Sequence, residues 1–505
     1  FYSAFDAPTA TNATLATLDV QKLYYHKLGT PQRADRLVYA STAHPDEFVS
    51  ADVSDDGRFV YLYRRQGAGV GNSLAWKRVD APDSAFRTVF DLQPNVDYHV
   101  LGNDGTRLYL RTNAGAPRSR VAWVDLRGPK ATLRPIVPES ADKLEEVSLI
   151  GDRLYLGYLH DAHALVKIAD LHGRPLGDVP LPGLGSGGLP VASHRHERIA
   201  YSVFQSYALP RTIYRFDTVV GTSTVAMRPK IAFDPNAYVT EQLFATSKDG
   251  TKVPVFVTHR KDMPLDGTTP TILYGYGGFD IPETPYFSTG DAMWLKMGGA
   301  YADAVLRGGG EYGEAWHDAG RLGQKQHVFD DFIAAAQMLI DRKITSTPRL
   351  AINGGSNGGL LVGAAETQRP DLFGAAIPEV GVLDMLRYQK FTVGKAWIPE
   401  YGSADASAEQ FAWLYAYSPD HNVKDGTHYP PTLIMTSDHD DRVYPAHSFK
   451  FAAALQHAQA GDAPILLRVE SKAGHGAGRP TDKIVDELAD RYAFLTKELN
   501  FTPAL

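Results

Sequence analysis

A four-fold repeat of short strand patterns constrains the first half of the chain more than any other feature. Between residues 50 and 220, a turn, an arginine and an alternating apolar run recur in "DDGRFVYLY", "NDGTRLYLR", "IGDRLYLGY" and "RHERIAYSV". The arginines are Arg58, Arg107, Arg153 and Arg198, spaced by 49, 46 and 45 residues. Each is followed by a second apolar run: "LAWKRVD", "VAWVDL", "LVKIADL" and "IYRFDT". A period of about 40–50 residues built from short strands and turns predicts β-propeller blades, because a generic β-sandwich would not repeat so regularly.

The number of repeats does not correspond to a whole number of propeller blades. An additional strand-like segment, "KLYYHKL", precedes the first full unit, so the sequence predicts four blades and part of a fifth. Propellers close with typically about 4–8 whole blades, and a fraction of a blade leaves an open sheet edge. We therefore expect the sequence to be a fragment of a longer chain, or to lack its N-terminal part.

The pattern changes after residue 230. The segment "VTEQLFATSKDGTKVPVFVTHRK" starts at Val239 and contains two alternating runs joined by Asp249-Gly250, a strong hairpin signal. Short apolar runs then alternate with helical patterns, of which the clearest cover 328–340 and 481–499. Strands that alternate with helices predict a mostly parallel sheet, whose ligands bind at the carboxyl ends of its strands.

Length and composition limit the classes that the protein can belong to. Since 505 residues are many for one core, we expect two domains, 1–230 being a partial β-propeller and 231–505 an α/β catalytic domain. A net charge of -7, spread along the chain, provides no basic stripe for nucleic acid. No apolar run approaches the roughly 18 residues of a membrane span. The absence of cysteine excludes disulfides and thiolate sites. We expect a soluble, cytoplasmic protein, although a periplasmic or secreted one stays open.

The segment "RLAINGGSNGGLLVG" places Ser356 between pairs of glycines, after a strand-like run and before a helical one. Residues 354–358 fit the G-x-S-x-G pattern of a nucleophile elbow. Glycine at 354 and 358 would relieve the clash that a sharp strand-to-helix turn creates. A phosphate-binding loop is disfavoured because no lysine follows the glycines. The pattern predicts a serine nucleophile.

A serine nucleophile needs a base, and the base needs an acid to orient it; in this fold the chain order is Ser, then Asp or Glu, then His. The run "TLIMTSDHDDRVYP" offers Asp438, Asp440 and Asp441 after one strand, and "ILLRVESKAGHGAG" offers His475 after the next. Position after the final strand favours His475 as the base. The rival histidines are His421, His428, His439 and His447. Spacing alone does not choose among the three aspartates.

Five segments together resemble the prolyl oligopeptidase (prolyl endopeptidase) family: "LYGYGGF", "RGGGEYGEAWHDAG", "NGGSNGGLL", "DHDDRV" and "KAGHGAG". The resemblance covers the whole chain. It implies an α/β-hydrolase catalytic domain capped by a seven-bladed β-propeller, with an N-terminal catalytic segment before the propeller. The present sequence starts inside the propeller, in agreement with a fragment. The implied activity is that of a serine endopeptidase that cleaves short peptides after proline through an acyl-enzyme, without metal or cofactor.

The resemblance also implies the roles of the catalytic residues. Ser356 is expected to be the nucleophile, Asp440 the acid and His475 the base, with Asp438 and Asp441 as supporting residues. The oxyanion hole is expected to consist of the Asn357 amide and the Tyr276 hydroxyl. Donors aimed at the developing oxyanion stabilise the transition state.

The specificity pocket follows from the same resemblance. Trp397 is expected to stack on the substrate proline, and Arg442 to bind a substrate carbonyl. An aromatic slot without charge suits a rigid apolar ring. A carboxylate from Glu379, near the pocket in sequence, would instead favour basic residues. The expected apolar walls are Phe279, Val382, Tyr401 and Val443.

Two other readings stay open at this point. One is a related hydrolase, an oligopeptidase for basic residues or an acyl-peptide hydrolase. The other is a propeller binding module that carries an inert hydrolase domain, which the complete Ser, Asp and His set opposes. We expect a monomer whose partners are short proline-containing peptides, and neither nucleic acid nor membrane.

Overall fold

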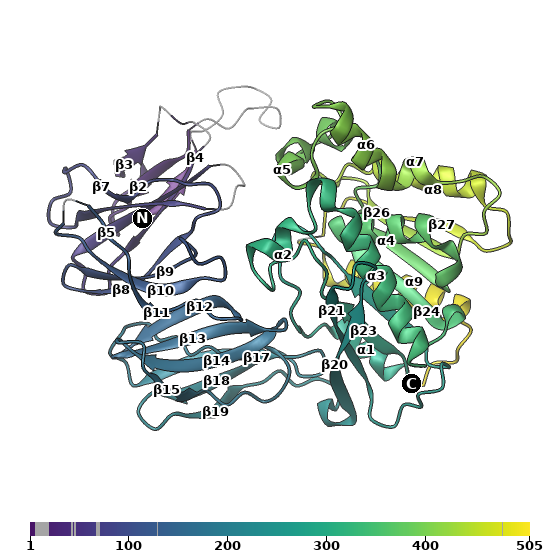
Figure 1. Ribbon diagram of the computed structural model, residues 1–505, viewed down its shortest axis with the longest axis horizontal. Coiled ribbons are helices and arrows are strands. Elements are labelled where there is room, and N and C mark those ends of the chain that lie inside the picture. The colour runs from purple at the N-terminus through teal and green to yellow at the C-terminus, as the bar shows by residue number, and fades with distance from the viewer. Residues whose placement is uncertain are drawn as a thin grey trace.

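The computed structural model describes residues 1–5, 20–41, 44, 47–66, 71–128, 130–476 and 478–504. Its two regions differ in architecture (Figure 1). Small antiparallel sheets form the N-terminal region, and one large sheet flanked by helices forms the C-terminal region.

The N-terminal region contains one three-stranded and four four-stranded sheets among its described residues, and consecutive strands are neighbours in each. The three-stranded sheet consists of β1 (Tyr2–Ala4), β2 (Lys22–Tyr25) and β3 (Arg36–Ala40). The first two four-stranded sheets are β4 (Glu47–Val53), β5 (Phe59–Gln66), β6 (Ser73–Arg78), β7 (Arg87–Phe90), and β8 (Tyr98–Asp104), β9 (Arg107–Thr112), β10 (Arg120–Asp125), β11 (Arg134–Val137). The other two are β12 (Lys143–Ile150), β13 (Arg153–His160), β14 (His163–Asp170), β15 (Pro175–Asp178), and β16 (Ser186–Gly187), β17 (Ile199–Gln205), β18 (Thr212–Asp217), β19 (Thr222–Met227).

Each sequence repeat corresponds to one four-stranded sheet. Arg107 and Arg153 begin β9 and β13, and Arg58 and Arg198 directly precede β5 and β17, so every repeat arginine lies at the start of a second strand. The apolar runs that follow form the third strands. Apolar side chains of successive sheets pack on one another, as where Tyr155 meets Phe216 edge-on at 5.6 Å. Face-to-face packing of such sheets is the architecture of a propeller.

The C-terminal region is built on one eight-stranded sheet with the order β20-β21-β23-β22-β24-β25-β26-β27. The predicted hairpin forms β20 and β21, and β21 pairs antiparallel with β23; the other neighbours are parallel. The strands are β20 (Tyr238–Thr246), β21 (Lys252–Arg260), β22 (Thr271–Gly275), β23 (Ala300–Ala304), β24 (Leu350–Gly355), β25 (Ala375–Glu379), β26 (Thr432–Ser437) and β27 (Ile465–Glu470).

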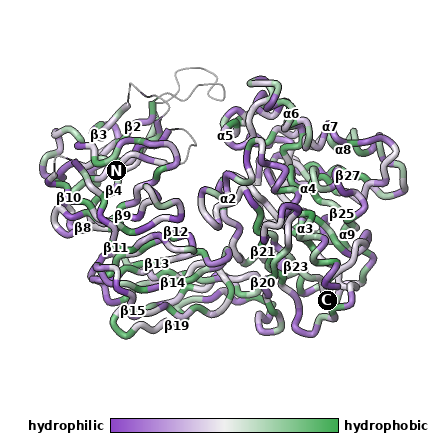
Figure 2. The backbone as a smooth tube through the Cα atoms, viewed as in Figure 1, coloured by the Kyte–Doolittle hydropathy of each residue, from purple (hydrophilic) through white to green (hydrophobic). Residues whose placement is uncertain are grey.

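Helices cover both faces of this sheet. Because side chains alternate along a strand, Ile352 packs with the cluster under α3 (Gln326–Asp341) and α4 (Asn357–Gln368). Ala351 packs instead with the cluster under α1 (Thr289–Lys296) and α9 (Thr481–Glu498). Hydrophobic stretches accordingly run through the sheets of both regions (Figure 2).

Among the described residues, no helix has the length and apolar character of a membrane span. The helices are α1 (Thr289–Lys296), α2 (Glu314–Asp318), α3 (Gln326–Asp341), α4 (Asn357–Gln368), α5 (Ile398–Tyr401), α6 (Ala408–Tyr417), α7 (Pro419–Asn422), α8 (Ala446–Ala458) and α9 (Thr481–Glu498).

Candidate active site

Ser356 lies on the turn that joins β24 to α4. Its backbone has φ 60° and ψ -115°, an uncommon conformation for a residue with a side chain. The Ser356 N–H donates to the Glu379 carbonyl oxygen at 2.8 Å. A Cβ at Gly354 would lie 2.5 Å from the Gly358 carbonyl oxygen, and one at Gly358 would lie 2.7 Å from the Gly275 carbonyl oxygen. The turn therefore requires glycine at both flanking positions.

Asp440 and His475 form a hydrogen-bonded pair. Asp440 follows β26, His475 follows β27, and His475 Nδ1 lies 2.7 Å from Asp440 Oδ2. The other carboxylate oxygen, Oδ1, accepts the backbone N–H groups of Arg442 at 3.0 Å and Val443 at 2.9 Å. The Asp440 carboxylate is fully buried. With Nδ1–H donated to this carboxylate, Nε2 of His475 is the ring nitrogen that can accept a proton.

The two neighbouring aspartates are placed differently. Asp438 Oδ1 lies 2.6 Å from Nδ1 of the exposed His439, and Asp441 is exposed. Of the three aspartates that spacing left open, Asp440 is the one that contacts His475.

Ser356 and His475 line one cavity of about 330 Å³. Other residues of its wall come from the segment before α9 and from α9 itself, among them Arg479, Ile484 and Glu487. Arg479 Nη2 donates to the Ser437 hydroxyl at 2.9 Å. The sequence analysis did not identify these wall residues, and they belong to no motif that marks them.

Tyr276 and Asn357 meet beside the serine. Tyr276 directly follows β22, and burial raises the pKa of its hydroxyl to about 12, although the Arg442 charge and the Ser356 side chain act in the opposite direction. Asn357 is the first residue of α4, and the first four N–H groups of a helix have no intrahelical partner. The Asn357 amide can therefore donate to a ligand.

The Asn357 side chain connects the two segments around it. Its Nδ2 donates to the Tyr276 carbonyl oxygen at 2.5 Å, and its Oδ1 accepts the Tyr401 hydroxyl at 2.9 Å. The segment that carries the expected oxyanion donor is thereby tied to a helix that carries an expected pocket wall.

The expected pocket residues lie in or against one apolar cluster. Val382, Tyr401 and Val443 are buried in it, whereas Phe279 and Trp397 pack on it. The Phe279 ring meets Tyr401 edge-on at 5.4 Å, and Trp397 stacks with Tyr388 at 6.3 Å. The sixth expected residue, Arg442, is exposed.

Glu379 lies at the end of β25 and also lines the cavity that contains Ser356. Its Oε1 lies 2.7 Å from Nη2 of Arg491 and accepts a hydrogen bond of 2.5 Å from Nδ2 of Asn353. The carboxylate is thus paired with an arginine of the protein itself.

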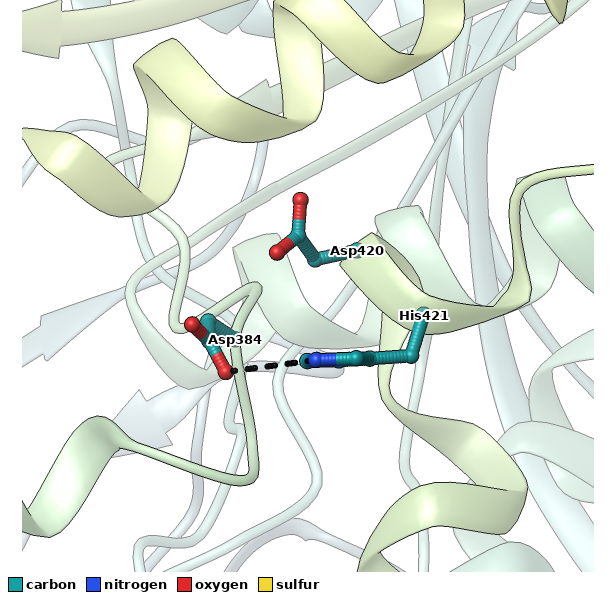
Figure 3. Close-up of side chains that lie close together, drawn as sticks. All are labelled: Asp384, Asp420 and His421. Atoms are coloured by element: carbon teal, nitrogen blue, oxygen red, sulfur yellow. Dashed lines mark ion pairs between the residues drawn. The ribbon is translucent and has the colours of Figure 1, made fainter.

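Asp384, Asp420 and His421 bring possible metal ligands together (Figure 3); one ligand atom from each lies within 4.8 Å of the others. The Lys450 ammonium, however, forms ion pairs with both carboxylates, and with Asp420 at 2.6 Å. Lysine therefore already supplies the cation of this cluster. The nearby His447 is buried, and its pKa is lowered by that burial to about 4.

The sequence analysis gave no role to three titratable residues behind the expected pocket: His317, Lys325 and Glu400. Glu400 is buried, and its Oε2 lies 2.8 Å from His317 Nε2. Lys325, also buried, donates to the Gly277 carbonyl oxygen at 2.8 Å. Two signals were available: Glu400 stands beside Tyr401, and His317 lies within the segment "RGGGEYGEAWHDAG".

Comparisons with known proteins found similar proteins for both regions of the chain. The model of the prolyl oligopeptidase family matches residues 285–502, and that of its N-terminal beta-propeller domain matches residues 1–229. A prolyl endopeptidase of Elizabethkingia meningoseptica is 43% identical over 500 residues, which cover 99% of this chain and 70% of that protein.

Solved structures give the same result. A chain from a structural study of two prolyl endopeptidases is 45% identical with a TM-score of 0.87, over 95% of this chain and 70% of that one. Oligopeptidase B from Leishmania major shares the fold: it is 24% identical, with a TM-score of 0.84, and the match covers 96% of this chain and 69% of that one. The predicted combination of a β-propeller and an α/β-hydrolase domain is confirmed.

Proposed function

Because the chain belongs to the prolyl oligopeptidase family, we propose that Ser356, Asp440 and His475 make it a serine endopeptidase that cleaves on the carboxyl side of proline. The hydrogen bond of 2.7 Å between His475 and Asp440 carries this proposal, since His475 lines the same cavity as Ser356. A buried acid, a histidine and a serine on a nucleophile elbow form the arrangement that acyl transfer requires.

The reaction begins when Ser356 Oγ attacks the carbonyl carbon of the substrate proline. His475 Nε2 accepts the hydroxyl proton, and Asp440 stabilises the imidazolium that forms. The Asn357 N–H and the Tyr276 hydroxyl donate to the oxyanion of the tetrahedral intermediate. Collapse of that intermediate breaks the C–N bond, and His475 returns the proton to the leaving amine. Water then attacks the acyl-enzyme by the same route and releases the acid.

The character of the expected pocket favours proline over a basic residue. The expected pocket residues belong to an apolar cluster rich in aromatic rings, and a proline side chain is apolar and rigid. Glu379, the carboxylate that could have selected a basic residue, is paired with Arg491. These contacts favour the prolyl activity over an oligopeptidase for basic residues.

Short peptides suit the space between the two regions. A cavity of about 680 Å³ is lined by propeller residues such as Tyr63, His99 and Lys143 and by Glu314 and His317 of α2. A substrate that reaches this space contacts both domains, which supports peptides over folded proteins as substrates. The monomeric state, the cytoplasmic location and the domain boundary at residue 230 stay predictions.

Two measurements test the function. A fluorophosphonate probe should label the protein and fail to label Ser356→Ala, whereas an inert binding module would not be labelled at all. Chromogenic peptides with proline or arginine before the scissile bond should show a clear preference for proline. A preference for arginine would instead support an oligopeptidase for basic residues.

A further inference from the structure

Buried charged side chains hold the backbone that follows β22. The Phe279 N–H donates to Glu400 Oε1 at 3.0 Å, and Lys325 Nζ donates to the Gly277 carbonyl oxygen at 2.8 Å. Lys325 Nζ also lies 3.6 Å from Glu400 Oε1, and His317 Nε2 lies 2.8 Å from Glu400 Oε2. Glu400 is thus the centre of a cluster that also contains His317 and Lys325.

Glu400 and Lys325 of this cluster are buried. Glu400 is 4% exposed and Lys325 is 1% exposed. Burial raises the pKa of Glu400, but hydrogen bonds from His317 and Phe279 and the Lys325 charge outweigh it, so the pKa is lowered. A buried ion pair is weak support for stability, because well-packed apolar residues often serve a core as well. The contacts of Glu400 with the pocket therefore suggest a role beyond packing.

Glu400 joins two expected walls of the pocket. It precedes Tyr401 in α5, and its carboxylate binds the amide of Phe279. Phe279 has φ 62°, a left-handed conformation that is costly for a bulky residue and needs support from its surroundings. In that conformation the Phe279 ring meets Tyr401 edge-on.

The same cluster reaches the space between the domains. His317 belongs to α2, which lies on the side of the catalytic domain that faces the propeller (Figure 1), and it lines the cavity there. Glu314 in the same helix accepts Nδ2 of the propeller residue Asn95 at 3.1 Å. The acid that binds Phe279 is therefore paired with a histidine at the domain contact.

We propose that Glu400 is a positioning residue for proline specificity, which holds Phe279 against Tyr401 with the help of His317 and Lys325. This inference rests on the proposed function, because it concerns the pocket of that activity. Glu400 acts through Phe279 and does not touch the reacting atoms. Its loss should therefore reduce discrimination between substrates more than it reduces the chemical step.

The experiment compares Glu400→Leu and Glu400→Gln with Asp405→Asn in the full natural protein. Asp405 is a matched control because it is an exposed acid near the same helix, paired with Lys390 at 3.2 Å. For each variant, kcat and KM are measured on peptides with proline or alanine before the scissile bond, and the melting temperature reports folding. The wild-type preference for proline is measured first and tests the proposed function separately.

Glu400→Leu should lower the ratio of kcat/KM for proline over alanine by about tenfold or more, in the range of one lost hydrophobic pocket contact, mainly through KM. Glu400→Gln should lose less, since its amide oxygen can still accept the Phe279 N–H. Asp405→Asn should keep the wild-type ratio. A folded Glu400→Leu with the wild-type ratio would overturn the proposal. If Glu400→Leu does not fold, Glu400→Gln and His317→Gln decide, and wild-type ratios in both would overturn it.

A double-mutant cycle with Phe279→Ala tests the route of the effect. If Glu400 acts through Phe279, the Glu400 substitutions should change the ratio less than about twofold once the Phe279 ring is absent, because residues in contact are not additive. An equal loss with and without the Phe279 ring would show that Glu400 does not act through Phe279, and would overturn the proposal.

Discussion

The hydroxyl of Tyr207 in the propeller donates a hydrogen bond of 2.6 Å to Asp303 Oδ2 on β23. Both residues are buried, so a carboxyl group lies inside the contact between the two domains. Burial raises the pKa of Asp303 to about 7 and the pKa of nearby Glu311 to about 8. These acids bind protons in the folded state at a pH where an unfolded chain releases them.

The first prediction concerns stability and pH. A carboxyl group whose folded pKa is raised stabilises the protein fully below its unfolded pKa, and this stabilisation is lost as pH rises through the folded pKa. The melting temperature should therefore fall as pH rises from about 5 to about 9, and Glu311→Gln should reduce that fall. One pKa unit corresponds to about 1.4 kcal/mol of unfolding free energy. Glu409→Gln, an exposed acid in α6, is the control; an unchanged slope in Glu311→Gln would contradict the prediction.

The second prediction concerns the nucleophile. Ser356→Ala should abolish turnover of a chromogenic proline peptide, and at most the roughly 10³–10⁴-fold acceleration over water from binding and the oxyanion hole should remain. The melting temperature should change little, because the substitution removes one hydroxyl group. Turnover near the wild-type rate would exclude Ser356 as the nucleophile.

The third prediction separates the aspartates. Asp440→Asn should lower kcat by about 10⁴, because an amide at this position favours the wrong histidine tautomer. Asp438→Asn is the matched control, since Asp438 contacts His439 and lies only two residues away. Steady-state measurement of kcat for both variants shows which aspartate is the catalytic acid. A larger loss in Asp438→Asn than in Asp440→Asn would mean that the acid is misassigned.

The fourth prediction concerns the oxyanion hole. Tyr276→Phe removes the hydroxyl that is expected to donate to the oxyanion and keeps the ring. We expect kcat to fall by about 10²–10³, the usual effect of removing one oxyanion donor. KM should change little, because the oxyanion exists only after attack. A loss confined to KM would assign Tyr276 to substrate binding instead.

The fifth prediction concerns specificity. Trp397→Ala should lower kcat/KM for a proline peptide about tenfold to a hundredfold more than for an alanine peptide, given a stacking contribution of about 0.5–1.5 kcal/mol and the lost apolar contact. Trp397 already stacks on Tyr388, which would hold its ring in place. Equal losses for both peptides would mean that Trp397 supports the fold without recognising proline.

Local periodicity was sufficient for much of the architecture. The spacing of Arg58, Arg107, Arg153 and Arg198 predicted the four-stranded sheets because each repeat folds mainly with itself and its neighbours. The glycines around Ser356 predicted the elbow because the clash that they avoid lies partly within five residues, between Gly354 and Gly358.

The sequence by itself determined the two architectures and predicted the serine, since each of these depends on patterns within short stretches of the chain. Spacing left three aspartates open, and the resemblance pointed to Asp440; only the tertiary structure shows that Asp440 meets His475, which lies 35 residues away. Only the tertiary structure also shows the ion pair between Glu379 and Arg491, and the hydrogen bond between Glu400 and the Phe279 N–H, 121 residues away. The physical reason is that hydrogen bonds and ion pairs depend on distances of a few ångströms, which the packing of separate segments sets and which no periodicity along the chain encodes.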